Sequence, residues 1–192
     1  MGCVASGVLS LILLICILWK FLVFHNPQNA EFQIESATVA GLKVDGSMSS
    51  GTWDFTLVAT NPNKKVSITC DTIEASLFKQ YIPYYATNRL PSLFINSSSH
   101  NRFNFKLGLV SHCIDADDAI EIFEEKTTRG LVTFKLWLVV DFTYRTKFWY
   151  VWDVKDSGLV LDITCEPVQF VFAPNNDTGI FRGQSATCHE GI

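Results

Sequence analysis

Residues 131–143 read LVTFKLWLVVDFT, with an apolar side chain at every second position. Successive side chains of a β-strand point to opposite faces, so a run with this period predicts a long strand with one face in a core. On the other face we expect Trp137, with Tyr144 and Trp149 beyond the run, to form an exposed surface for a protein partner. The remaining residues of that face are Thr133, Lys135, Val139, Asp141 and Thr143.

Shorter alternating runs fill much of residues 31–192 and predict further strands. Asp156-Ser157-Gly158 separates two of these runs, and this composition is typical of a turn, so we expect a hairpin there. The runs are Trp53–Ala59, Phe103–Leu109, Phe148–Val154 and Leu159–Cys165.

Two breaks in the alternation predict β-bulges. The apolar positions that end at Cys70 resume out of phase at Ile73, so one residue of Asp71-Thr72 should be unpaired. A second break falls at Pro167, and proline inside a strand belongs at an edge or a bulge.

One segment has helical spacing. Ala116, Ala119, Ile120 and Phe123 would form an apolar stripe facing the core. Acidic residues in the first turn suit the positive end of the helix dipole, and Gly130 suits the position after the helix. About seven strands and one helix indicate a mostly β fold, an antiparallel β-sandwich of immunoglobulin or fibronectin-III type.

An apolar segment precedes this domain, which we take as residues 31–192. Residues 4–24 contain one charge, Lys20, and as a helix they are roughly 31 Å long, about the thickness of the hydrocarbon core of a bilayer. We therefore expect a transmembrane helix between a tail of residues 1–3 and a connector of residues 25–30. A cleaved signal peptide and a buried helix are the alternatives.

Short motifs mark candidate modification sites. The start Met-Gly-Cys-Val-Ala-Ser fits N-myristoylation of Gly2, with Cys3 as a palmitoylation site. Asn96 and Asn176 lie in sequons, which favour an extracellular domain, whereas Lys20 beside the span favours a cytosolic one.

The domain contains an even number of cysteines, which permits disulfides in an oxidising compartment. Buried free thiols are the other interpretation. Cys165–Cys188 is the pair to test first. The full set is Cys70, Cys113, Cys165 and Cys188.

Charge and motifs argue against several function classes. Of 15 Lys+Arg residues, Lys20 precedes the domain, which leaves 14 against 19 Asp+Glu, so we expect no nucleic-acid partner. Ser111-His112-Cys113 is the one cluster of nucleophile and base types, but neighbours on a strand face opposite sides. No metal or cofactor motif appears, so we expect neither an enzyme nor a cofactor.

A longer stretch carries a family resemblance. Residues 57–85 read LVATNPNKKVSITCDTIEASLFKQYIPYY, and Leu90-Pro91-Ser92-Leu93-Phe94 follows. With the amino-terminal span and the helix, this order of features resembles the plant NDR/HIN-like family, whose members carry a late embryogenesis abundant (LEA) group 2 domain. Cys70 stands where that family usually has tyrosine.

The resemblance implies a single-pass plasma-membrane protein of plants, with its sandwich in the apoplast and a non-catalytic role in defence or stress response. It further implies contacts with a protein or with the cell wall, and it leaves self-association into a homo-oligomer open. A membrane-tethered module that binds a lipid or another small apolar ligand is the alternative.

Asn61-Pro62-Asn63 has a physical role that does not depend on the family. Pro62 removes a backbone donor and so ends the strand, while the side chains of Asn61 and Asn63 can bond neighbouring backbone groups. The motif therefore predicts a turn that sets register, without catalytic chemistry.

Overall fold

The computed structural model describes residues 7–8, 10–18, 27–79, 82–148, 152–183 and 185–191. Residues 10–18 are helical and precede the domain. The elements of the domain are β1 (Glu31–Asp45), β2 (Met48–Thr60), β3 (Val66–Lys79), β4 (Ile82–Leu90), β5 (Leu93–Ile95), β6 (His100–Cys113), α2 (Ala116–Glu124), the π-helix η1 (Glu125–Arg129), β7 (Leu131–Phe148), β8 (Trp152–Phe172), β9 (Gly179–Phe181) and β10 (Ala186–Glu190).

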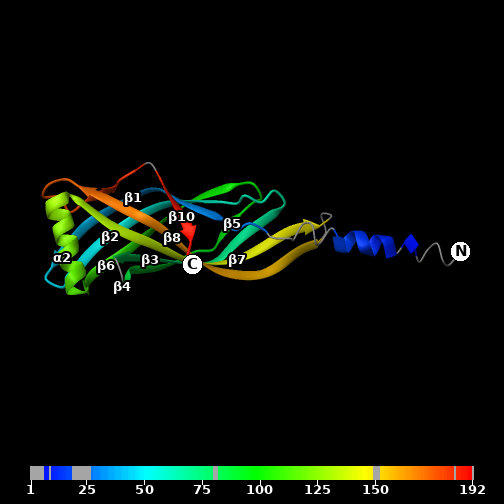
Figure 1. The fold of residues 1–192 in the computed structure, drawn as a ribbon, viewed down its shortest axis with the longest axis horizontal. Coiled ribbons are helices and arrows are strands. Elements are labelled where there is room, and N and C mark those ends of the chain that lie inside the picture. The colour runs from blue at the N-terminus through cyan, green and yellow to red at the C-terminus, as the bar shows by residue number, and fades with distance from the viewer. Residues whose placement is uncertain are drawn as a thin grey trace.

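The strands form two packed layers joined along one edge (Figure 1). One layer has the order β4-β3-β7-β8, with β5 beside β3, and the other has the order β10-β1-β2-β6. Both β9 and β10 pair with β1 and with β8, so they join the layers. At the opposite edge the Asn88 side chain of β4 donates to the carbonyl of Lys106 on β6, at 3.0 Å. The predicted mostly β, antiparallel architecture is confirmed.

Aromatic side chains fill the space between the layers. Trp53 of β2 meets Phe134 of β7 edge to face, with 5.6 Å between ring centroids. Phe55 of β2 meets Phe170 of β8 at 6.3 Å in the same manner. All four side chains are buried. Because each pair joins strands of different layers, these contacts fix how the layers face each other.

The long alternating run lies in β7, and its predicted core face is buried. The hairpin predicted at Asp156-Ser157-Gly158 is wrong, because these residues lie inside β8. The β7–β8 register shifts there, with Phe142 opposite Leu159 but Tyr144 opposite Asp156. Residues that favour turns also suit the irregular backbone of a bulge, which explains the error.

Both predicted bulges are confirmed. The β3–β7 register shifts between Cys70 and Thr72, so Asp71 is the extra residue. The β7–β8 register shifts again opposite Pro167. Each bulge lets an apolar alternation continue on the core face after one residue has been inserted.

The helical segment begins at Ala116, and a left-handed Gly130 (φ 62°) follows it, as the sequence predicts. Its last five residues form the π-helix η1, which the sequence analysis did not anticipate. Of the predicted apolar stripe, only Ala119 is buried. Ile120 and Phe123 are each 56% exposed. The buried residues of α2 are Asp118, Ala119 and Ile122.

Lys79 of β3 accounts for this orientation. Its side chain is only 3% exposed, and its Nζ lies 2.7 Å from Glu125 Oε2 and 3.0 Å from Glu121 Oε1. A buried cation needs counter-charges and hydrogen-bond partners. The helical segment therefore turns its carboxylate-bearing face inward, and Ile122 is buried with that face.

Within the described part of the chain, no helix has the length and apolar character needed to cross a bilayer. The predicted span of residues 4–24 extends at both ends beyond the described residues, and Gly2 and Cys3 also lie outside them.

Truncation of the central indole tests the core. Trp53→Ala removes a fully buried side chain that packs against Phe134, so we expect a loss of about 3–5 kcal/mol in the free energy of unfolding. Chemical denaturation of the purified protein measures it. Phe94→Ala, at a position that is 47% exposed, is the matched control and should change stability by about 0.5 kcal/mol or less. Equal losses in the two variants would contradict this account of the core.

Candidate functional site

The turn between β2 and β3 is built around one buried amide. Asn61 is 1% exposed, and its Nδ2 donates to the carbonyls of Val66, Ile95 and Asn96, at 2.9, 3.3 and 3.0 Å. Its Oδ1 accepts from the backbone N–H and from the side chain of Asn63, at 3.0 and 2.9 Å. Asn61 therefore joins the end of β2 to the start of β3 and to the end of β5.

Asn63 extends this network to the connector. Its Nδ2 donates to the Gln28 carbonyl at 2.7 Å, and its Oδ1 accepts from the Gln28 N–H at 2.9 Å. The next residue, Asn29, donates to Glu190 of β10 at 2.6 Å and accepts a hydrogen bond from the Tyr144 hydroxyl of β7. Two consecutive connector residues are thus fastened to the domain.

The predicted partner surface is not assembled as expected. Tyr144 is buried, and burial raises the pKa of its phenol to about 12. Trp137 is half-buried and packs edge to face on Phe78, at 5.4 Å between centroids. Trp149 lies outside the described residues. Tyr144 follows Phe142 by two residues, so the alternation of β7 itself places its side chain on the core face. Only its partner Asn29, which lies in the connector, could not be read from the periodicity.

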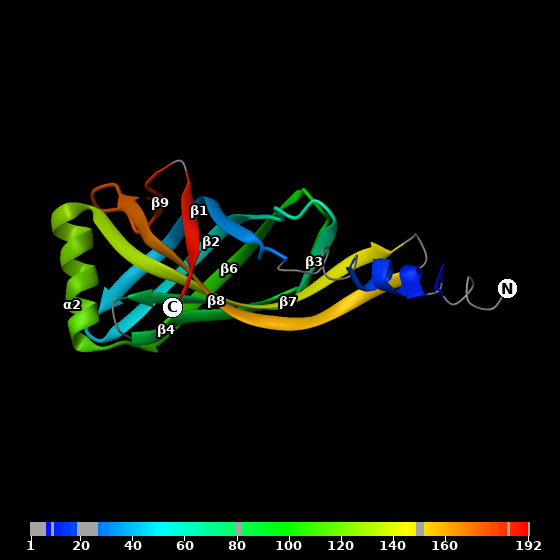
Figure 2. The same ribbon diagram turned by 45° about the vertical axis from the view of Figure 1, so that its right-hand side comes forward.

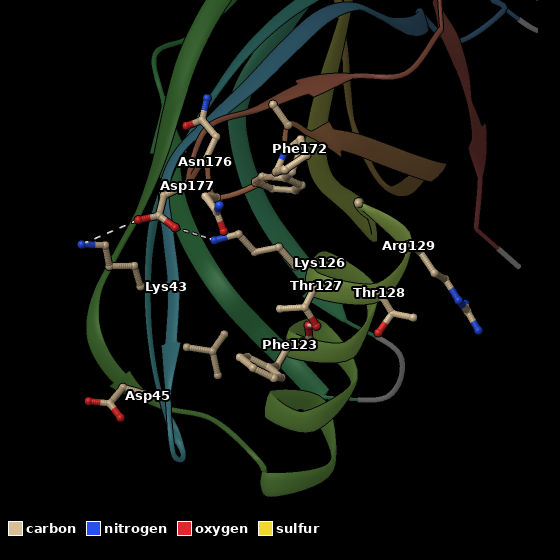
Figure 3. Close-up of a pocket in the computed structure, with 15 residues that line it drawn as sticks. Lys43, Asp45, Phe123, Lys126, Thr127, Thr128, Arg129, Phe172, Asn176 and Asp177 are labelled. Atoms are coloured by element: carbon tan, nitrogen blue, oxygen red, sulfur yellow. Dashed lines mark hydrogen bonds and ion pairs between the residues drawn. The ribbon is translucent and has the colours of Figure 1, made fainter.

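A pocket lies at the other end of the sandwich, between η1, the end of β1 and the loop after β8 (Figure 3). Its volume is about 890 Å³. At its centre, Lys126 donates to the Leu42 carbonyl and to Asp177 Oδ1, both at 2.6 Å. The same ammonium lies 5.5 Å from the centre of the Phe172 ring.

Asp177 is the acidic partner in this pocket. The hydrogen bond from Lys126 is the main cause that lowers the pKa of its carboxyl, and Lys43, at 3.7 Å, adds to the effect. Arg129 points away from this pair in Figure 3, while Phe123 lines the wall below Lys126. The pocket offers ammonium, carboxylate, amide and hydroxyl groups beside the apolar surface of Phe123 and Phe172, a lining that suits a ligand with both polar and apolar parts.

No sequence motif predicted this pocket. Lys126 and Asp177 are 51 residues apart, and only the fold brings η1 against the loop after β8. Asn176 was singled out as a sequon, and it lies exposed in the pocket wall, with its Oδ1 accepting from the Thr178 N–H at 2.9 Å. The other sequon residue, Asn96, is exposed after β5, beside the Asn61 network.

The cysteines occupy distinct environments. Cys188 of β10 stands opposite Cys165 of β8, and a disulfide joins their sulfurs. Burial raises the pKa of the Cys70 thiol to about 12, which keeps it protonated at neutral pH. Cys113 is exposed at the end of β6. Across the residues that the structure describes, no group of three or more His, Cys, Asp and Glu side chains could hold a metal ion.

Substitution of Asn61 tests the turn network. Asn61→Asp keeps the acceptor but places a carboxylate oxygen against the three carbonyls that the amide now binds. We expect a loss of about 3 kcal/mol in unfolding free energy, at least as large as for Asn61→Ala. Asn104→Ala, at an exposed position of β6, is the control and should leave the denaturation midpoint nearly unchanged. An unchanged midpoint in Asn61→Asp would show that these hydrogen bonds do not stabilise the fold.

The Asp177 ion pair predicts a pH dependence. A carboxyl whose pKa is lowered on folding adds stability at neutral pH, and this stability is lost as the pH falls below its ordinary value. Asp177→Asn should therefore melt at a lower temperature at pH 7 and show a smaller fall in Tm between about pH 5 and pH 3. Thermal melts across this range measure it, with Asp45→Asn as a charge-matched control in the same wall. Parallel Tm curves for wild type and Asp177→Asn would contradict the assignment.

Comparison with known proteins leaves the family of the chain open. No family model matches the sequence, and no curated protein matches it. Among solved structures, a protein from Archaeoglobus fulgidus aligns with 11% identity and a TM-score of 0.30, over 73% of this chain and 98% of its own. The solution structure of a provisionally assigned LEA protein aligns with 14% identity and a TM-score of 0.28, over 83% of this chain and 84% of its own. Alignments at this level assign neither a family nor a function.

Proposed function

We propose that this chain is a single-pass plasma-membrane protein of plants that acts without catalysis in defence or stress response. Its β-sandwich lies on the apoplastic side and makes contacts with a protein or with the cell wall. The proposal starts from the sequence: the apolar residues 4–24 precede a domain whose motifs resemble the NDR/HIN-like family.

One structural observation supports it most. Asn61 and Asn63 belong to the stretch that carries the resemblance. Their side-chain amides donate hydrogen bonds to backbone carbonyls, that of Asn61 to Val66 and that of Asn63 to Gln28 of the connector. The motif thus works as a fastening between the domain and the segment that leads to the amino terminus. Such a role suits a domain that must be held at a membrane.

The pocket supports a binding role at the opposite end. The pocket that contains Lys126 and Asp177 is also lined by Phe123 of α2. Figure 1 shows α2 at the end of the sandwich that lies away from the helical residues 10–18. A domain tethered through its amino terminus would therefore present the pocket away from the bilayer. The alternative of an apolar ligand between the layers has less support, because aromatic side chains of the chain itself fill that space. The open pocket is lined by charged as well as apolar residues.

Expression of the full chain in plant cells tests this proposal. The chain should stay in the membrane pellet after carbonate extraction, because an apolar span resists removal by high pH. In sealed microsomes the domain should be protected from added protease. Asn96 and Asn176 should carry glycans, so glycosidase should shift the wild type but not a variant with both residues changed to Gln. Release by carbonate, or digestion of the domain in sealed vesicles, would overturn the proposal.

A further inference from the structure

The pocket between η1, the end of β1 and the loop after β8 has walls that are bonded to one another. Lys126 of η1 donates to the carbonyl of Leu42 in β1 and to the carboxylate of Asp177 in the loop, both at 2.6 Å. The Leu42 N–H in turn donates to the Asp177 carbonyl at 3.0 Å. Each of the three walls therefore holds the other two, and a site with fixed walls loses little conformational entropy when it binds a ligand.

The position of Phe172 at the same pocket is fixed as well. Its N–H donates to the Gly130 carbonyl at 2.8 Å, which fastens the end of β8 to the residue after η1. A Cβ atom at Gly179 would lie 2.6 Å from the Phe172 ring, so any larger residue there would displace the ring. Glycine at this position thus lets the ring lie 5.5 Å from the Lys126 ammonium.

Phe123 of α2 offers an apolar surface in the wall of the pocket. Its side chain is 56% exposed, so a ligand that covers the ring would remove apolar area from water. In Figure 3 the Phe123 ring lies on one side of Lys126 and the Phe172 ring on the other. A lipid tail requires a continuous apolar lining, and here a charged group separates the two rings.

Polar groups that can bind hydroxyls lie in the same lining. The Asp177 side chain is 43% exposed, and the ammonium of Lys43 lies 3.7 Å from its Oδ2. An acceptor and a donor this close together can bind two neighbouring hydroxyl groups, because each hydroxyl both donates and accepts. Thr128 and Asn175 are exposed in the lining and add a hydroxyl and an amide. The pocket therefore combines hydroxyl-binding groups with an apolar ring.

We propose that this pocket binds a saccharide, with the apolar face of one sugar ring against Phe123 and with hydroxyl groups bonded to Asp177 and Lys43. A pyranose ring carries C–H groups on its faces and hydroxyl groups around its rim, which matches the two kinds of surface in the lining. In Figure 3 the Asn176 amide is directed away from Lys126, so a glycan on Asn176 would begin outside the centre of the pocket.

The inference deepens the proposed function, because it names saccharides as the class of cell-wall ligand. It rests on that proposal for the source of the saccharide, whereas the chemistry of the site stands on the residues that line the pocket. The two proposals can therefore fail separately.

Titration with two soluble oligosaccharides tests the inference. The full chain is produced in a bacterial strain that forms disulfides and attaches no N-glycans, and it is purified in detergent. Cellohexaose supplies neutral sugar rings, and hexagalacturonate supplies rings with carboxylate groups. We expect isothermal titration calorimetry to show binding of at least one of them. Phe123→Ala should weaken that binding about tenfold, because the contact between the aromatic ring and the sugar is lost.

Ile120→Ala is the matched control. Ile120 belongs to the same helix and is also 56% exposed, but it does not line the pocket. This variant should bind the oligosaccharide as tightly as the wild type does. Both side chains are exposed, so we expect the three proteins to melt at the same temperature, which excludes misfolding as the cause of a difference in affinity.

The outcomes separate this inference from the membrane proposal. Weaker binding in Phe123→Ala but not in Ile120→Ala supports the saccharide site. Binding of neither oligosaccharide, or an equal affinity in the two variants, overturns it. A chain that carbonate releases from membranes but that binds a saccharide through Phe123 overturns the anchor and keeps the site. A chain that stays in the membrane pellet and binds neither oligosaccharide overturns the site alone.

Discussion

The buried carboxamide of Asn61 is the contact on which the connector end of the sandwich depends. It donates to carbonyls at the start of β3 and after β5, and it accepts from Asn63, which in turn holds Gln28. Carbonyl groups that lie outside a strand ladder and away from water cost free energy when they are unpaired. The Asn61 side chain satisfies carbonyl groups of β3, of β5 and of the residue after β5. These hydrogen bonds therefore fix the positions of the segments relative to one another.

A second polar contact sets the other end. The apolar core keeps the layers together, but it does not specify which face of α2 turns toward them, because Ile120 and Phe123 offer as much apolar surface as Ala119 and Ile122. The ion pairs of Lys79 with Glu121 and Glu125 determine which face of α2 and η1 turns toward the sandwich. The free energy needed to bury an unpaired ammonium exceeds the free energy lost by exposing two apolar side chains. The orientation that pairs Lys79 is therefore favoured although Ile120 and Phe123 remain exposed.

The two ends of the sandwich carry different groups of polar contacts. One end fastens the connector through the amides of Asn61 and Asn63 and through the hydrogen bond from the Tyr144 hydroxyl to Asn29. The other end carries an ion pair in an open pocket, in which Lys126 binds both Asp177 and a carbonyl of β1.

The sequence by itself determined the long alternating strands β2, β3, β6 and β7, the two bulges, and the start of the helical segment with the glycine that follows it. These features follow from the period of apolar residues and from local backbone preferences. It also singled out Asn61, Pro62 and Asn63 as a turn without catalytic chemistry. Only the tertiary structure decided that Asp156-Ser157-Gly158 lies at a bulge within β8, that the Tyr144 hydroxyl bonds to Asn29, and that Lys126 pairs with Asp177. Each of these three features depends on a contact with a residue that is distant in the sequence. A local sequence pattern does not show which distant residue the fold brings into contact.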